Sequence, residues 1–215
     1  MTYTAWTRNQ MAARIAQDIW DGAVVNIGIG MPELVCDYLP PEKEVLLHSE
    51  NGVLGMGPRP ADDAVDPDLI NAGKRPTTVL PGACFFDHAT SFAMMRGGHL
   101  DIAILGAFQV SEAGDIANWS TGKLGAIPAV GGAMDLAAGA KQVFVMMELL
   151  TKTGESKLVQ HCSYPLTGLA CVTRIYSDLA VLDIAPDGVA VRERVDGLSQ
   201  AELQAMVPVR LIGEE

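Results

Sequence analysis

Glu50 is the side chain of this 215-residue sequence that is best placed to do chemistry. It lies in the run Ser49-Glu50-Asn51-Gly52, directly after residues 45–48, a largely apolar stretch that is typical of a buried strand. Glycines 52, 55 and 57 follow, and we expect a turn that lets a ligand approach the backbone closely. In α/β proteins, ligand-binding groups gather where strands end and loops begin. Glu50 is therefore a candidate functional carboxylate, with an ordinary surface carboxylate as the alternative.

A first glycine turn, at Gly28 and Gly30, follows a strand expected over residues 23–27 and leads into a helix expected over residues 32–38. The helix carries a proline in its first turn, where the missing N–H is no loss. A dinucleotide-binding turn would need a third glycine where Glu33 stands, and this carboxylate would occupy the place of the pyrophosphate. We therefore reject nicotinamide-dinucleotide binding and interpret the segment as a tight strand-to-helix turn.

A second glycine turn, Gly131-Gly132, opens another expected helix. Two glycines at a helix start leave backbone N–H groups free, which is the geometry of an anion or oxyanion site. Many helix starts carry glycine without binding anything. The pattern alone therefore leaves the role of this turn open.

The histidines and cysteines give no sign of a metal site, because the sequence has no H-E-x-x-H motif and no paired Cys/His spacing. His48 lies two residues before Glu50 on the same expected strand, so the two side chains could face the same side. It could tune the carboxylate, although a hydrogen-bonded structural histidine is expected. The four cysteines form no C-x-x-C pair and are interpreted as reduced thiols of a cytoplasmic protein.

Composition limits the classes of partner. The net charge of −11 argues against nucleic acid and anionic membranes as ligands. No apolar run approaches the roughly 20 residues of a membrane span, and the N-terminus shows no basic segment followed by an apolar run, so we expect a cytoplasmic protein. The hydrophobic fraction of 49% indicates either a parallel sheet buried on both faces or an apolar subunit interface.

Strands that alternate with helices predict an open, largely parallel α/β sheet with flanking helices, in a single domain over residues 1–215. Thr7 with Gln10, and Ser199 with Glu202, have the spacing of a capping box and predict the starts of the first and last helices. The remaining expected elements are a helix over residues 87–96 and strands over residues 77–80, 101–105, 142–147, 168–176, 179–184 and 189–194.

Five blocks in order, residues 24–30, 49–58, 68–74, 91–99 and 130–136, resemble the B subunit of the family I CoA-transferases, the 3-oxoacid CoA-transferase family. The resemblance implies that family's fold, which is related to ribose-5-phosphate isomerase. It also implies that Glu50 is the nucleophile and that Gly131 supplies a backbone N–H to an oxyanion. The residues that it assigns to substrate and CoA binding are Asn26, Gly28, Gly30, Asn51, Gly52, Lys74 and Gly132.

The resemblance further implies transfer of CoA from succinyl-CoA to a 3-oxo acid through a covalent glutamyl-CoA intermediate, with ping-pong kinetics and no cofactor beyond the CoA thioester substrate. Residues 106–111, 126–130, 141–147 and 154–159 are most similar to members that use 3-oxoadipate in the degradation of aromatic compounds. Acetoacetate or another short-chain acid is the alternative acceptor. A sugar-phosphate isomerase or a non-catalytic subunit on the same fold is a more remote alternative. The implied partner is an A subunit, in a heterodimer that pairs into a heterotetramer.

Overall fold

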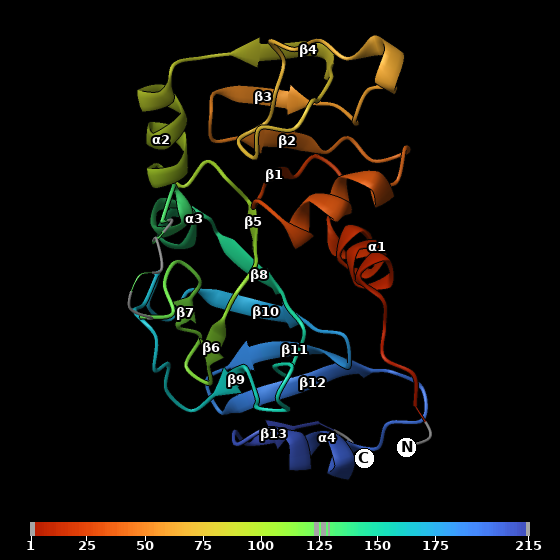
Figure 1. Cartoon of the computed structure of the whole chain (residues 1–215), viewed down its shortest axis with the longest axis vertical. Helices are drawn as coiled ribbons and strands as arrows, with labels where there is room; N and C mark the ends of the chain where they lie inside the picture. The colour runs from red at the N-terminus through yellow and green to blue at the C-terminus, as the bar shows by residue number, and fades with distance from the viewer. Residues whose placement is uncertain (1–2, 123–124, 126–127, 129, 214–215) are drawn as a thin grey trace.

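The computed structural model describes residues 3–122, 125, 128 and 130–213 (Figure 1). Its main feature is a ten-stranded sheet with the order β13-β12-β11-β10-β8-β5-β1-β2-β3-β4. The five central strands run parallel to one another. They are β10 (Val172–Tyr176), β8 (Gln142–Met146), β5 (Ile102–Leu105), β1 (Val24–Ile27) and β2 (Leu46–Ser49).

Further strands extend the sheet on both sides, at the top and bottom of Figure 1, and they pair antiparallel except for β13, which is parallel to β12. One side carries β3 (Val53–Met56) and β4 (Val79–Phe85), and the other carries β11 (Ala180–Ala185), β12 (Gly188–Arg194) and β13 (Leu211–Ile212). A small second sheet has the order β7-β6-β9, from Ile116–Ala117, Gln109–Ser111 and Leu158–Val159. The open, largely parallel α/β sheet is thus confirmed.

Helices cover both faces of the central strands. The α-helices are α1 (Arg8–Asp18), α2 (His88–Arg96), α3 (Ala133–Gly139) and α4 (Gln200–Met206), and the 3₁₀ helices are η1 (Met31–Tyr38) and η2 (Asp62–Ala64). Ile102 and Ile104 of β5 pack into the core beneath α1, whereas Ala103 and Leu105 pack into the core beneath α2 and α3. Both faces of β5 are therefore buried, which accounts for its continuous apolar run.

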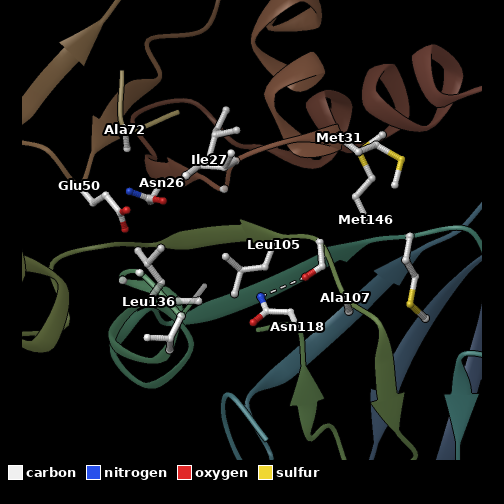
Figure 2. Close-up of a pocket in the computed structure, with 18 of the residues that line it drawn as sticks. Asn26, Ile27, Met31, Glu50, Ala72, Leu105, Ala107, Asn118, Leu136 and Met146 are labelled. Carbon is white, nitrogen blue, oxygen red and sulfur yellow. Dashed lines mark hydrogen bonds between the residues drawn. The ribbon is translucent and has the colours of Figure 1, made fainter. Parts of the chain in front are cut away.

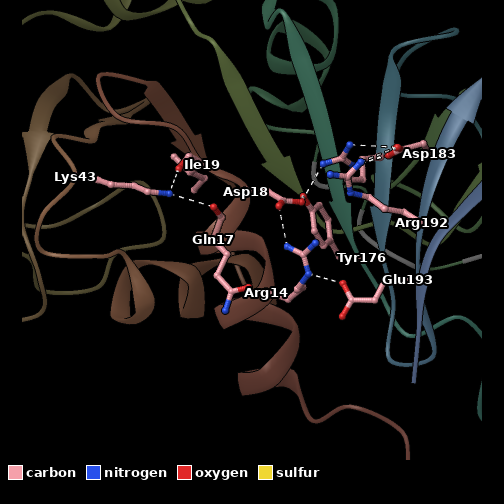
Figure 3. Close-up of polar contacts among 10 residues, drawn as sticks. Arg14, Gln17, Asp18, Ile19, Lys43, Tyr176, Asp183, Arg192 and Glu193 are labelled. Atoms are coloured by element: carbon pink, nitrogen blue, oxygen red, sulfur yellow. Dashed lines mark hydrogen bonds and ion pairs between the residues drawn. The ribbon is translucent and has the colours of Figure 1, made fainter. Parts of the chain in front are cut away.

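A polar cluster joins α1 to the sheet on the face that α1 covers (Figure 3). Asp18 accepts hydrogen bonds from Arg14 at 2.8 Å, Arg174 at 2.9 Å and the Tyr176 hydroxyl at 2.7 Å. Burial alone would raise the pKa of Asp18, but the hydrogen bonds from Arg14 and Tyr176 and the two arginine charges hold it below its usual value. Arg174 also pairs with Asp183 of β11. The cluster therefore fixes α1 against β10 and β11.

The ends of α1 and α4 follow the predicted capping. The Thr7 hydroxyl accepts from the Gln10 N–H at 3.2 Å, and the Gln10 side chain accepts from the Thr7 N–H at 2.8 Å. Ser199 and Glu202 form the same pair of bonds. Both predicted capping boxes are confirmed.

No described helix is long and apolar enough to cross a membrane.

The glycine-rich segment after Glu50 is where the local prediction was wrong. A turn was expected there, but Val53–Met56 forms β3, antiparallel to β2 and β4. Gly52 and Gly55 have φ angles of 109° and 87°, and the register with β4 shifts between Leu54 and Met56. Glycine here allows a tight hairpin and a bulged strand.

The helix expected after Gly30 is a 3₁₀ helix, and β6, β7, β9 and β13 were not predicted.

Candidate active site

Glu50 directly follows β2, at the carboxyl end of a central parallel strand, and its side chain is half-buried. The Gly52 N–H donates to the Ser49 carbonyl at 2.9 Å, which closes the tight turn around Glu50. The Ser49 hydroxyl accepts from the Ala72 N–H at 2.9 Å. This bond holds the segment around residues 71–74 beside the turn. The predicted position of Glu50 where a strand meets a loop is therefore correct.

A cavity of about 420 Å³ opens beside Glu50 at the carboxyl ends of the central strands (Figure 2). This is the place where ligands bind in open α/β sheets. Its described lining is largely apolar and carries only two charged side chains, those of Glu50 and Lys157. The apolar wall comes from Ile27, Ile29, Met31, Leu105, Ala107, Phe108, Val130, Leu136, Met146 and Met147.

The environment raises the pKa of the Glu50 carboxyl above its usual value. Burial is the main cause, and the nearby Asp135 carboxylate acts in the same direction. The charge of His88 and an interaction with the Gly132 backbone N–H oppose this shift. Glu50 is thus a partly desolvated carboxylate, which is held by few groups and is correspondingly available for reaction.

The second glycine turn lies against this carboxylate. A Cβ added at Gly132 would collide with Glu50 Oε2, and one added at Gly131 would lie 3.8 Å from Oε1. Gly131 has a φ of 48°, in the left-handed region that glycine adopts without strain. Among the described residues, no carbonyl accepts from the N–H of either glycine. The Gly132 N–H therefore interacts with the Glu50 carboxylate, and the Gly131 N–H has no acceptor in the described part of the chain.

Asn26 reaches the cavity from β1, and a buried hydrogen-bond chain fixes its side chain. Its amide nitrogen donates to His48 Nδ1 at 2.9 Å and to the His48 carbonyl at 3.2 Å. Because an amide nitrogen only donates, Nδ1 is the acceptor and Nε2–H donates to the Ser91 hydroxyl at 3.1 Å. Burial lowers the pKa of His48 to about 4, so the ring is neutral at physiological pH. His48 therefore holds Asn26, as the expected structural histidine, and forms no hydrogen bond with Glu50.

The first glycine turn is closed by the chain itself. The Gly28 N–H donates to the Ile104 carbonyl at 2.8 Å, and the Gly30 N–H donates to the Glu33 carboxylate at 3.1 Å. Glu33 also pairs with Arg75 at 3.1 Å. Its carboxylate therefore occupies the turn where a phosphate would have to bind, as the sequence predicted.

The structure brings together only part of the predicted site. Asn26, Gly28, Glu50, Gly131 and Gly132 all line the cavity. The other four, Gly30, Asn51, Gly52 and Lys74, are not part of its described lining. The Asn51 amide instead donates to the Ile70 carbonyl at 2.8 Å, and Lys74 is exposed, so their predicted roles in CoA binding remain predictions.

Three groups near the site were missed in the sequence. They are Ser91 behind His48, His88 beside Glu50, and Lys157 in the cavity lining. Each is distant in sequence from the residue or cavity that it serves, so no local spacing could identify it.

Among the described residues no group of His, Cys, Asp and Glu side chains could hold a metal ion. Burial raises the pKa of Cys162 and of Cys171 to about 11, which keeps these thiols protonated at neutral pH.

Residues 8–199 match the coenzyme A transferase family, and this chain belongs to that family. It is 65% identical over 206 residues to the B subunit of the 3-oxoadipate CoA-transferase of Pseudomonas putida, and the match covers 96% of each chain. It is 50% identical over 197 residues to the B subunit of a probable succinyl-CoA:3-ketoacid coenzyme A transferase of Bacillus subtilis, and that match covers 91% of this chain and 90% of the other.

The fold is similar to that of a solved acyl-CoA transferase from Escherichia coli O157:H7, with a TM-score of 0.70 at 18% identity. The match covers 96% of this chain but only 41% of that protein, so this chain spans about two fifths of its length. Both bacterial relatives are designated as B subunits, which implies an A subunit in those enzymes. Family membership and fold confirm the resemblance that was inferred from the sequence.

Proposed function

We propose that this chain is the B subunit of a transferase that moves CoA from succinyl-CoA to a 3-oxo acid, with Glu50 as the nucleophile. The observation that carries the proposal is the half-buried Glu50 carboxylate, which lines a largely apolar cavity and lies against Gly131 and Gly132. Transfer between two acids is nearly thermoneutral, so the enzyme must keep the energy of the thioester in covalent intermediates. A carboxylate nucleophile does this without any cofactor besides the CoA thioester.

In the first step, Glu50 attacks the thioester carbonyl, giving an acyl-glutamyl anhydride and a CoA thiolate. Burial leaves the carboxylate poorly hydrated, so little water must be displaced before attack. The oxyanion that forms on the substrate needs a donor. Gly131 is suited to this role, because its N–H has no carbonyl acceptor among the described residues and is next to the Gly132 N–H, which interacts with Glu50.

In the second step, the thiolate attacks the glutamyl carbonyl, the first acid leaves, and a glutamyl-CoA thioester remains. The oxyanion of this step forms on an oxygen of Glu50 itself. The Gly132 N–H already interacts with that carboxylate, so it is placed to stabilise this charge. One preorganised donor of this kind is worth about 3–4 kcal/mol. The incoming acid then reverses both steps and carries CoA away.

The apolar wall protects these intermediates. Anhydrides and thioesters hydrolyse readily, so water must be kept from the carbonyl under attack. Leu105 and Leu136 face the cavity from the side opposite Asn26 and Ala72 (Figure 2). Asn118 adds rigidity because its amide donates to the Gly106 carbonyl at 3.1 Å and accepts from Thr167 at 2.7 Å.

We propose 3-oxoadipate as the acceptor. The support is the 65% identity to a relative named for that substrate, which exceeds the 50% identity to a relative named for 3-keto acids in general. Acetoacetate is the second candidate on the strength of the latter relative. A sugar-phosphate isomerase would need a basic phosphate-binding loop, whereas the described lining of this cavity has one cation.

The proposed partner is an A subunit that completes the site, in a heterodimer that pairs into a heterotetramer. Three exposed apolar side chains, Ile29, Phe108 and Val130, belong to the cavity lining. Exposed apolar groups around a binding cavity indicate a surface that another chain covers. The net charge of −11 also leaves few cations for the phosphates of CoA, so further binding groups are expected from the partner.

Kinetics of the reconstituted A–B complex test this proposal. We expect parallel lines in reciprocal plots, a higher kcat/KM for 3-oxoadipate than for acetoacetate, and no transfer by either chain alone. A sequential pattern would contradict the covalent scheme. A preference for acetoacetate would overturn only the acceptor, and robust transfer by this chain alone would overturn the partner.

A further inference from the structure

Lys157 is the one charged group of the described cavity lining that the steps above do not use. It directly precedes β9, whereas Glu50 directly follows β2. Figure 1 shows these two strands in different parts of the molecule, β9 with the small sheet and β2 in the large one. The cavity therefore extends from a carboxylate on one sheet to a cation beside the other.

The backbone of Lys157 is fully engaged, so its ammonium is the group that it can offer to a ligand. Its N–H donates to the Leu149 carbonyl and its carbonyl accepts from the Val110 N–H, both at 2.9 Å. Within the described part of the chain, no side chain forms an ion pair or hydrogen bond with the ammonium. Its charge lowers the pKa of Glu148, but the ion-pair partner of Glu148 is Arg8, at 2.8 Å.

The surface that belongs to the same cavity is apolar. Leu105, Met146 and Met147 contribute to it, and the polar Asn118 is occupied by its bonds to Gly106 and Thr167. A ligand that fills this cavity therefore meets a carboxylate, an apolar wall and a half-buried lysine. A volume of about 420 Å³ is within the range of small-molecule sites.

We propose that Lys157 binds the second carboxylate of a dicarboxylic acyl group, such as succinyl or 3-oxoadipyl, while the other end of that group reacts at Glu50. This assignment rests on the proposed function, and it names the class of acid that the site selects. The methylene groups of such an acid match the apolar wall. The flexible stem of lysine lets one ammonium reach the ends of acids of different length.

Charge makes this contact important in this chain. A dicarboxylic acid approaches a protein that carries a net charge of −11 and a Glu50 side chain that is itself anionic when it attacks. The second carboxylate must leave water on entering the cavity, which is unfavourable unless a cation receives it. A monocarboxylic acid of the same length has no such requirement. Lys157 therefore favours dicarboxylic over monocarboxylic acids in this cavity.

The test compares matched acids in the reconstituted A–B complex. Lys157→Met keeps the stem and removes the charge, and Lys157→Arg keeps the charge. Lys152→Met removes an exposed cation that also lowers the pKa of Glu148 but does not line the cavity. The substrate pairs are succinyl-CoA with butyryl-CoA and 3-oxoadipate with 3-oxohexanoate. In each pair only the second carboxylate differs.

We expect Lys157→Met to lower kcat/KM for succinyl-CoA and 3-oxoadipate by about 10- to 100-fold, the effect of losing one charge-assisted hydrogen bond. Its values for butyryl-CoA and 3-oxohexanoate should stay within about twofold of the unmodified complex. Lys157→Arg should retain most of the preference, and Lys152→Met all of it. Equal losses for both classes of acid, or no loss at all, would overturn the assignment.

Calorimetric binding of succinate and butyrate to the A–B complex gives a second readout that needs no turnover. We expect the complex to bind succinate more tightly than butyrate, and Lys157→Met to abolish that difference. If no acyl-CoA supports transfer but the binding difference is present, the proposed function fails and the carboxylate subsite stands. Equal binding of the two acids by the unmodified complex would overturn the subsite.

Discussion

The two glycine turns of this chain have similar sequences but present different groups to the cavity. At the first turn, the N–H groups of Gly28 and Gly30 bond to the Ile104 carbonyl and the Glu33 carboxylate. At the second, the Gly132 N–H interacts with Glu50 and Gly131 has no carbonyl acceptor among the described residues. The first turn contributes the Asn26 side chain that precedes it, and the second contributes backbone donors. The partner of each N–H, rather than the glycine spacing, decides which turn can do chemistry.

The largest effect is expected at the second turn. Gly132 has a φ of −88°, which alanine adopts without strain, but the added Cβ would collide with Glu50 Oε2. Gly132→Ala should therefore displace Glu50, the proposed nucleophile, and lower kcat by about 100-fold, the typical effect of misplacing a reacting group by about 1 Å. Steady-state kinetics of the A–B complex measure this. Unchanged kcat would mean that the turn does not position Glu50.

The same substitution at the first turn should act on stability instead. Gly30 has a φ of 97°, and no atom lies within 4 Å of the Cβ that alanine would add. Gly30→Ala should lower the free energy of unfolding by about 1–3 kcal/mol because of backbone strain, and kcat should change less than twofold. Denaturant titration and kinetics together check this. A large loss of kcat in a folded complex would show that the first turn also takes part in catalysis.

Asn26 precedes the first turn and reaches the cavity, and the hydrogen bonds through His48 to Ser91 hold its side chain in place. A substitution of Ser91 tests the contribution of these bonds to stability. Ser91→Ala removes the acceptor of the buried His48 Nε2–H, which should cost about 1–3 kcal/mol of stability. Ser163→Ala is the matched control, because its hydrogen bonds to Gln109 are exposed and its effect should stay within about 0.5 kcal/mol. Equal unfolding free energies for the two variants would contradict the stabilising role given to the buried hydrogen bonds of Asn26, His48 and Ser91.

The smallest expected effect is on stability, and it differs between Glu33 at the first turn and Glu50 beside the second. Burial raises the pKa of Glu50, so its charged form destabilises the fold. Glu50→Gln should therefore stabilise the chain at pH 7 by less than about 1 kcal/mol. This gain should shrink as the pH falls through the raised pKa, because the wild-type carboxyl then takes up a proton.

Glu33→Gln is the control for this pH dependence. It weakens the contacts of the Glu33 carboxylate with Arg75 and the Gly30 N–H, and should slightly destabilise the chain. Thermal unfolding of the three proteins between pH 4 and 7 gives the comparison. A loss of stability in Glu50→Gln at pH 7 would contradict the burial of its charge.

Much of the fold and half of the site could be read from the sequence, because they depend on local patterns. The capping boxes at Thr7 and Ser199 act over three residues, and the apolar run 102–105 reports burial on both faces. Strand β3 was missed because Gly52 and Gly55 look like a turn, and only pairing with β2 and β4 makes them a strand.

The rest of the site depends on contacts between distant parts of the chain. Lys157 and Glu50 line one cavity although 107 positions separate them in the sequence. Asn51 and Lys74 were assigned to the site by resemblance, and the structure places both outside its described lining. The local pattern therefore made Glu50 a candidate and the family resemblance proposed it as the nucleophile, whereas the groups around it required the three-dimensional structure.

The central claim is that Glu50 carries CoA, and mass spectrometry of the intermediate tests it most directly. The A–B complex is incubated with succinyl-CoA, digested, and searched for a peptide whose mass is increased by that of CoA joined to a glutamyl carbonyl. We predict this adduct on Glu50, its loss when an acceptor acid is added, and neither adduct nor turnover in Glu50→Ala. An adduct on another residue, or full turnover by Glu50→Ala, would contradict the account.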